Sequence, residues 1–179
     1  MKTIPTERLT LRAFRSGDLY DFHEYAVSDL VGPNAGWRPH SSIEETRRVL
    51  LGFIGSDLLW AITENVSGKM IGSISIHRDR MRDIASAMRM GYSMNPAFWG
   101  KGYMPEAAGA VLDYAFEELN VSIVSVDHFP ENERSRRVIE KCGFRPEGTI
   151  RRAVELYDGR VCDLVTYSMS DDEYYRLKF

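Results

Sequence analysis

The chain has 179 residues, of which 44% are hydrophobic and 27% charged, and its formal net charge is -3. This length predicts one globular domain over residues 1–179 with its own hydrophobic core. Because acidic and basic residues are mixed along the chain, the basic face that duplex nucleic acid requires is not expected.

The amino-terminal segment and the two cysteines bear on the cellular compartment. Residues 1–10 are polar and lack the charged region and apolar stretch of a secretory signal peptide. No apolar run is long enough to span a bilayer. Cys142 and Cys162 have no CxxC spacing, so neither a disulfide framework nor a zinc site is expected. We therefore expect a cytoplasmic protein with no membrane association and no bound metal.

The first half of the chain shows strand and helix patterns around one long loop. Leu9, Leu11 and Ala13 alternate with polar neighbours, which is the period of a half-buried strand. Ser42 and Glu45 have capping-box spacing, which predicts the start of a helix. The elements expected here are a strand at residues 7–14, a helix capped by Ser16 and running to about Val27, an ordered loop at 28–40, a helix from Ser42 to about Gly55, and strands at 58–63, 70–77 and 85–94.

The second half predicts further helices and strands. Apolar residues recur at helical spacing from Ala107 to Leu119, so a long amphipathic helix is expected after Gly102. The remaining expected elements are a strand at residues 121–126, a helix from Asn132 to Lys141 ended by Gly143, two strands joined by a hairpin turn at Asp158-Gly159, and a short helical turn at 171–179. Together these patterns predict one α/β domain with a mixed sheet.

The segment NPAFWGKGYMPEA, residues 95–107, leads from a strand into a helix amino terminus. Its turn contains Gly100, Lys101 and Gly102. Because the glycines have no side chains, a pyrophosphate can approach the backbone N–H groups closely, and the helix dipole favours its negative charge. A tight turn without a ligand is the alternative for this segment alone. An ATP-binding turn is disfavoured, because no Ser or Thr follows Lys101 to hold a metal ion.

A second segment, NERSRRVIEKCGF at residues 132–144, lies one helix and one strand further on. Together the two segments resemble the acetyl-CoA motifs of the GNAT superfamily of N-acetyltransferases, in particular its ribosomal-protein N-terminal (Rim-type) branch. The resemblance covers most of the chain, from TERLTLRAF near the amino terminus to RRAVELYDGRVCDLVTYSM near the carboxyl terminus. It implies the GNAT fold, a central mixed and splayed β-sheet flanked by helices, with pantetheine between the fourth and fifth strands.

The same resemblance implies which residues bind acetyl-CoA, the expected acetyl donor. The backbone amides from Gly100 to Met104 would contact the pyrophosphate, and the main chain of Ser93 and Met94 would contact pantetheine. The Met94 N–H would also polarise the thioester carbonyl, a contribution on the order of 3 kcal/mol in other acyl transfers. The full set of implied cofactor-binding residues is Ser93, Met94, Trp99, Gly100, Lys101, Gly102, Tyr103, Met104, Asn132 and Arg137.

Besides Met94, the candidate catalytic residues are Asn132 and Ser135. In a helix that begins at Asn132, the residues Asn132, Ser135 and Ile139 share one face, and the resemblance implies that this face looks toward the thioester. Many relatives have a tyrosine in place of Ile139 that protonates the leaving thiolate. Ser135 is therefore expected to assist the thiolate here, with Asn132 orienting cofactor or substrate. The other reading is that Asn132 caps the helix and Ser135 is solvated.

The sequence offers no evident general base. Relatives often have an acidic residue two positions before the Gly91-Tyr92 pair, but Arg89 stands there. A chain of water molecules could remove the proton instead, and four side chains remain open candidates: His77, Glu155, Asp163 and Tyr167. Glu106 lies in the first turn of a helix, where the dipole favours a carboxylate, so a structural role is expected for it.

The resemblance implies an acceptor pocket that includes Trp37, Tyr157 and Asp158, although Trp37 could instead be a packing anchor. We expect a primary amine as acceptor, first of all a ribosomal-protein-like N-terminus, with a polyamine or small-molecule amine as the alternative. A non-catalytic acyl-CoA-binding regulatory module is the other alternative, because Arg89, Ile139 and Met104 depart from common catalytic or cofactor-loop choices. The oligomeric state is expected to be a monomer or a homodimer.

Overall fold

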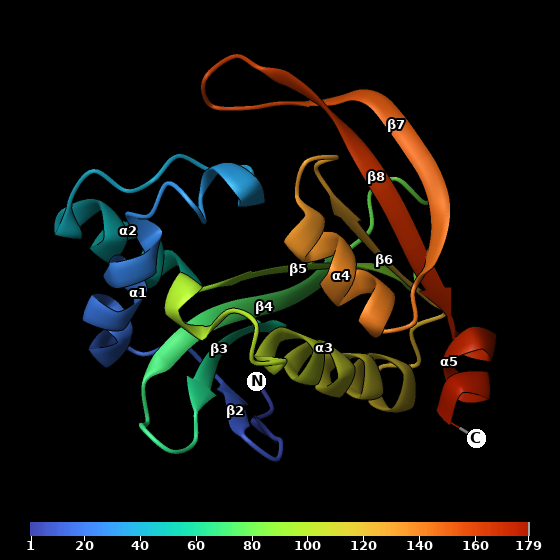
Figure 1. Ribbon diagram of the computed structural model, residues 1–179. Coiled ribbons are helices and arrows are strands. Elements are labelled where there is room, and N and C mark those ends of the chain that lie inside the picture. Colours follow the sequence, from blue (N-terminus) through green and yellow to red (C-terminus); the bar gives the residue numbers. More distant parts are fainter. Residues whose placement is uncertain (179) are drawn as a thin grey trace. The chain divides into compact units, whose positions relative to one another are not determined.

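Residues 1–178 are described by a computed structural model of the chain (Figure 1). They divide into two compact units. Unit 1 comprises Met1–Ser75 and Tyr92–Ala107, and unit 2 comprises Ile76–Gly91 and the chain from Ala108 onward. Two strands and one helix contribute residues to both units. These elements are β4 (Met70–Arg78), β5 (Ala87–Met94) and α3 (Tyr103–Asp113).

The strands form an eight-stranded mixed sheet in the order β1-β2-β3-β4-β5-β6-β8-β7. Its other strands are β1 (Ile4–Pro5), β2 (Leu9–Arg12), β3 (Leu59–Glu64), β6 (Ile123–His128), β7 (Arg145–Glu155) and β8 (Val161–Ser170). Strands β5 and β6 run parallel, whereas β2–β3, β3–β4, β6–β8 and β7–β8 are antiparallel pairs. The predicted α/β class, with a mixed sheet flanked by helices, is confirmed.

In unit 1, helices α1 (Leu19–Ala26) and α2 (Ile43–Phe53) pack against each other. Their apolar faces contribute Phe22, Tyr25 and Leu50 to a buried core that continues onto β3 and β4. The predicted cap of α2 is present, because the Ser42 hydroxyl accepts the Glu45 N–H at 3.1 Å. This core packs α1 and α2 against β3 and β4.

The beginning of α1 corrects one prediction. Ser16 does not cap this helix, because it lies inside a 3-10 turn over Ser16–Asp18, and α1 begins at Leu19. The Asp18 carboxylate explains the difference: it accepts the Arg15 N–H at 2.9 Å and the Arg12 guanidinium at 2.7 and 2.8 Å. The buried Asp18, rather than Ser16, therefore accepts a backbone N–H ahead of α1.

Unit 2 is built on the antiparallel strands β6, β8 and β7. Helix α4 (Glu133–Lys141) packs against β6, and α5 (Asp171–Lys178) packs against β8. The hairpin predicted at Asp158-Gly159 joins β7 to β8, with Gly159 at a φ of 82°, a left-handed conformation that glycine adopts without strain. The short helix predicted at the end of the chain is α5, and Phe179 lies outside the described residues.

Strand β1 and the division of the long helix were not predicted. Strand β1 escaped because it has only two residues, Ile4 and Pro5, and such a segment carries no period. The long helix predicted after Gly102 divides into α3 and a π-helical turn over Tyr114–Glu118. Over residues 1–178, no helix is both long enough and apolar enough to cross a membrane.

Candidate functional site

The segment between β5 and α3 is fixed by side chains of unit 1. The buried Asn95 donates its side-chain N–H to Glu24 at 2.9 Å, and its Oδ1 accepts the Ala97 N–H at 3.0 Å. The Trp99 indole N–H donates to the Met94 carbonyl at 2.8 Å. Trp99 thus ties the segment back to the end of β5.

The following turn exposes backbone N–H groups at the start of α3. Gly100 and Gly102 have φ values of 77° and 78°, in the left-handed region that favours glycine. The Glu106 N–H donates to the Gly102 carbonyl at 3.2 Å, so the N–H groups of Tyr103 and Met104 precede this helical bond. A Cβ placed at Gly100 would meet no atom of the described chain within 4 Å. An anion such as a pyrophosphate fits this turn, because the helix dipole and the preceding amides favour it.

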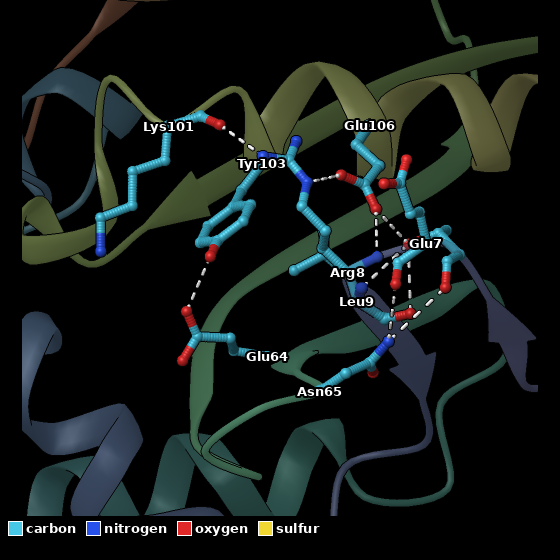
Figure 2. A network of polar contacts seen from close by, with 9 residues as sticks. Glu7, Arg8, Leu9, Glu64, Asn65, Lys101, Tyr103 and Glu106 are labelled. Carbon is cyan, nitrogen blue, oxygen red and sulfur yellow. Dashed lines mark hydrogen bonds and ion pairs between the residues drawn. The ribbon is translucent and has the colours of Figure 1, made fainter.

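Arg8 holds this turn from the amino-terminal side (Figure 2). Its guanidinium donates to the Lys101 carbonyl at 2.9 Å and to the Glu106 carboxylate at 2.7 Å, and lies 4.8 Å from the centre of the Tyr103 ring. The Tyr103 hydroxyl in turn donates to Glu64 at 2.8 Å. Lys101, Tyr103 and Glu106 are thereby linked to the residue before β2 and to the end of β3, although the linked positions are 39 to 98 residues apart in the sequence.

Glu106 has the structural role that was expected from its place in the first helical turn. Its carboxylate accepts the Thr6 hydroxyl at 2.6 Å, the Arg8 N–H at 2.8 Å and the Arg8 side chain. Burial raises the pKa of Glu106, but the hydrogen bonds from Thr6 and Arg8 lower it overall. The carboxylate therefore stays ionised and anchors the helix start.

The predicted pantetheine contacts lie on β5 within unit 1. The Ser93 hydroxyl is 3.1 Å from the Ser73 hydroxyl on β4, and the Met94 side chain is buried. Gly72 is needed there, because an added Cβ would lie 2.5 Å from the Ser93 carbonyl. The Met104 side chain is only 6% exposed, so it points into the protein.

The other motif lies in unit 2, on α4. The Asn132 side chain accepts the Ser135 N–H at 3.1 Å, so Asn132 caps α4. Ile139 is buried at 1% exposure, Ser135 is half-buried, and Arg137 is exposed. The helix thus fixes Ser135 in its first turn, and the catalytic roles of Asn132 and Ser135 remain predictions.

The predicted acceptor residues have different surroundings. In unit 1, Trp37 packs against the α1–α2 core with its ring 5.5 Å from that of His40, as the packing-anchor reading expects. In unit 2, Tyr157 and Asp158 are exposed at the β7–β8 hairpin. The Asp158 carboxylate accepts the Arg160 side chain at 2.7 Å, and this hydrogen bond lowers the pKa of Asp158. Their contact with an acceptor remains a prediction.

The four open candidates for a general base all lie in unit 2. Asp163 accepts the Arg152 N–H at 2.7 Å, and burial raises the pKa of Tyr167, whose ring lies 5.7 Å from that of His128. Burial and the nearby Arg89 lower the pKa of His77. The remaining candidate, Glu155, is exposed on β7.

A further acidic residue was missed by the sequence analysis. Asp127 lies on β6 and forms an ion pair with Arg89 of β5. The strand expected at residues 121–126 stops short of Asp127, whereas β6 continues to His128, so the pairing with Arg89 became visible only in the structure. A metal site has no support in residues 1–178, where no group of three or more His, Cys, Asp or Glu side chains could hold an ion.

Comparison with known proteins adds independent information. The family model for the acetyltransferase (GNAT) domain matches residues 8–145. The uncharacterized N-acetyltransferase p20 of Bacillus licheniformis is 26% identical over 179 residues, covering 97% of this chain and 99% of that protein. YdaF of Bacillus subtilis, named as a candidate ribosomal N-acetyltransferase, is 35% identical over 107 residues, which cover 60% of this chain and 57% of YdaF.

Solved structures show the same fold. A GNAT-family acetyltransferase from Bacillus anthracis has a TM-score of 0.86 and 27% identity, covering 96% of this chain and 100% of that one. A spermidine N-acetyltransferase from Vibrio cholerae, solved with CoA and spermine, has a TM-score of 0.77. The match covers 95% of this chain and 99% of the spermidine N-acetyltransferase chain. Because the two sequences are only 22% identical, this similarity is evidence for the fold and not for the substrate.

Proposed function

The chain belongs to the GNAT family of acetyltransferases, and we propose that it transfers an acetyl group from acetyl-CoA to the N-terminal amine of a protein. The observation that carries the donor half of this proposal is the turn at the start of α3. There, Gly100 and Gly102 adopt left-handed conformations before a helix amino terminus. Such a turn suits the pyrophosphate of CoA because backbone amides can reach it without interference from side chains.

Each part of the candidate site has a distinct task in this reaction. The amides from Gly100 to Met104 bind the pyrophosphate, while the main chain of Ser93 and Met94 aligns pantetheine. The Met94 N–H donates to the carbonyl oxygen of the thioester and stabilises the negative charge that develops there. The Ser135 hydroxyl donates a hydrogen bond to the departing sulfur. Asn132 holds the first turn of α4, which fixes the Ser135 backbone.

The choice of a protein N-terminus rests on the relatives. YdaF, which carries a ribosomal N-acetyltransferase name, is 35% identical to this chain over 107 residues. The polyamine alternative has less support, since the spermidine N-acetyltransferase resembles this chain at 22% identity. We therefore rank protein N-termini first and polyamines or small amines second.

A thiol-release assay tests the proposal. Wild-type protein is incubated with acetyl-CoA and a panel of ribosomal-protein N-terminal peptides, polyamines and small amines, and free CoA is measured. Ser135→Ala is compared with Ser16→Ala, a matched loss of an exposed hydroxyl in unit 1. We expect release that depends on an acceptor, and a kcat about 10- to 150-fold lower for Ser135→Ala, because a hydrogen bond to a charged group contributes about 1.5–3 kcal/mol.

Three outcomes would count against parts of the proposal. Tight acetyl-CoA binding without turnover on any acceptor favours a regulatory acyl-CoA-binding module. Turnover on polyamines alone contradicts the protein acceptor. A labelled acyl-enzyme with ping-pong kinetics contradicts direct attack of the amine on the thioester.

A further inference from the structure

Asp127 lies in unit 2 where the parallel β5–β6 ladder ends. The register of this ladder runs from Ala87 with Ile123 to Arg89 with Ser125. Strand β6 continues beyond it to His128, held by β8, where Asp127 is opposite Thr166. Asp127 is therefore two residues past the last β5–β6 pair. On its other edge, β6 is still paired with β8 at this position.

One cation orients the Asp127 carboxylate. The Arg89 guanidinium, from the last residue of β5 in the ladder, forms an ion pair with Oδ2 of Asp127. An ionised carboxylate accepts hydrogen bonds at both oxygens, so Oδ1 can still take a proton. Arg89 is the one charged residue of β5, and Asp127 is the one acidic residue of β6. Across these two strands, Asp127 is thus the one carboxylate available for proton transfer.

The neighbouring carboxylate, Asp79, is committed to the structure. It is 2% exposed and accepts hydrogen bonds from the Ser125 hydroxyl at 2.7 Å and the Met81 N–H at 2.9 Å, and it pairs with Arg82 at 3.2 Å. The Asp127 side chain, by contrast, keeps 17% of its surface exposed. A group that must exchange protons with a substrate and with solvent needs such access.

We propose that Asp127 is the general base for the acceptor amine and that Arg89 is the positioning residue that orients it. This inference rests on the proposed acetyl transfer. A proton passes from the ammonium nitrogen of the acceptor to Asp127 Oδ1, and the nitrogen lone pair then forms a C–N bond with the thioester carbonyl carbon. When the C–S bond breaks, a second proton from that nitrogen reaches the sulfur through the Ser135 hydroxyl. Asp127 finally releases its proton to solvent.

The charged surroundings of Asp127 suit a base. Burial raises its pKa, the Arg89 guanidinium and His128 oppose that rise, and Asp79 adds to it, so that the pKa lies above the ordinary 3.8. His77 on β4 also interacts electrostatically with Asp127. A higher pKa makes the carboxylate a stronger base, while leaving it ionised once the pH exceeds that pKa.

The competing interpretation is that Arg89 and Asp127 only tie β5 to β6. Removing one partner of such a pair lowers stability and reduces activity to the same extent at every pH. A general base behaves differently. Removing a general base lowers kcat/KM strongly at a pH where the acceptor amine is mostly protonated. The decrease is small when the pH exceeds the pKa of the amine, because free amine then forms without help.

The test compares Asp127→Asn with Asp83→Asn, a control that removes one exposed carboxylate from the same unit. For each protein, kcat/KM is measured from pH 6 to pH 10 with an acceptor that the wild type uses, together with the Kd for acetyl-CoA and the thermal midpoint. We expect Asp127→Asn to lose about 100-fold in kcat/KM at neutral pH and to recover much of it above the amine pKa. Its Kd for acetyl-CoA and the activity of Asp83→Asn should stay within about twofold of wild type.

Arg89→Lys supplies the second readout, since lysine keeps the charge without the planar guanidinium. If Arg89 orients Asp127, this variant lowers kcat but keeps the wild-type shape of the pH profile, without the recovery above the amine pKa that Asp127→Asn shows. A pH-independent loss with a lower thermal midpoint, or a loss below threefold, overturns the assignment of Asp127. If the wild type acetylates no amine in the panel, the proposed function itself fails; an active wild type with an equally active Asp127→Asn contradicts the base alone.

Discussion

Arg8 shows how one side chain can organise a binding turn made of backbone. Its guanidinium contacts the Lys101 carbonyl and the Glu106 carboxylate, on either side of the start of α3. Glycine at positions 100 and 102 gives the amides access to an anion but also leaves that turn without side chains to hold it. Arg8, together with the hydrogen bond from Tyr103 to Glu64, therefore supplies rigidity that the two glycines do not.

We predict that Arg8→Ala weakens acetyl-CoA binding about 10-fold, because a hydrogen bond involving a charged group contributes about 1.5–3 kcal/mol. The Kd is measured by titration calorimetry with CoA. Arg47→Ala, which removes an exposed arginine from α2 in the same unit, is the control and should bind CoA as the wild type does. An unchanged Kd for Arg8→Ala would show that the turn keeps its shape without this contact.

At the residue scale, two local capping signals agree with the structure and the one at Ser16 does not, while the non-local contacts have no local signal. The caps at Ser42 and Asn132 depend on residues three positions away, and both are present. The contacts of Arg8 with Lys101 and of Arg89 with Asp127 join residues that are distant in sequence, so no periodicity predicts them. Trp99 was named among the cofactor-binding residues from the sequence, but the bond from its indole N–H to the Met94 carbonyl required the structure.

At the scale of elements, most helices and strands follow from their periodicity, and the errors have physical causes. Ser16 was expected to begin α1, yet the Asp18 carboxylate takes the Arg15 N–H and the chain forms a 3-10 turn first. An Asx-type acceptor two residues later competes with a serine for the same turn. Where no such competitor exists, as at Ser42 before α2, the cap lies at the predicted position.

The cap of α2 supports a prediction about stability. Ser42→Ala removes the acceptor for the Glu45 N–H and should lower the free energy of unfolding by about 1 kcal/mol. Ser42→Asp should retain it, because aspartate is an equally good N-cap and suits the helix dipole. Urea titrations of both variants measure the effect. Equal losses for the two variants would mean that the hydroxyl contributes through a contact other than capping.

At the scale of the whole molecule, the sequence predicted a mixed sheet but not its strand order. Period and turn signals give strands one at a time, whereas the order depends on which strands pair over long separations. The candidate site shows the same limit. The glycine turn and the α4 motif were found from residues close in sequence, while Asp127 became visible only when β5 and β6 were paired.

The single domain expected for residues 1–179 gives the last prediction. Strands β4 and β5 and helix α3 run through both units, so each unit contains parts of elements that the other also needs. We therefore predict that the two units unfold in one cooperative transition.

The distribution of tryptophan and cysteine allows each unit to be followed separately. All three tryptophans, Trp37, Trp60 and Trp99, lie in unit 1, and both cysteines, Cys142 and Cys162, lie in unit 2. Burial raises the pKa of Cys142 to about 11, which protects its thiol in the folded state, so a Cys162→Ser variant reports on unit 2 through Cys142 alone. Urea midpoints from tryptophan fluorescence and from pulsed thiol labelling should coincide. If unit 2 becomes labelled at a urea concentration where the fluorescence of unit 1 is still native, the chain consists of two separately folding parts, and the single-domain prediction is wrong.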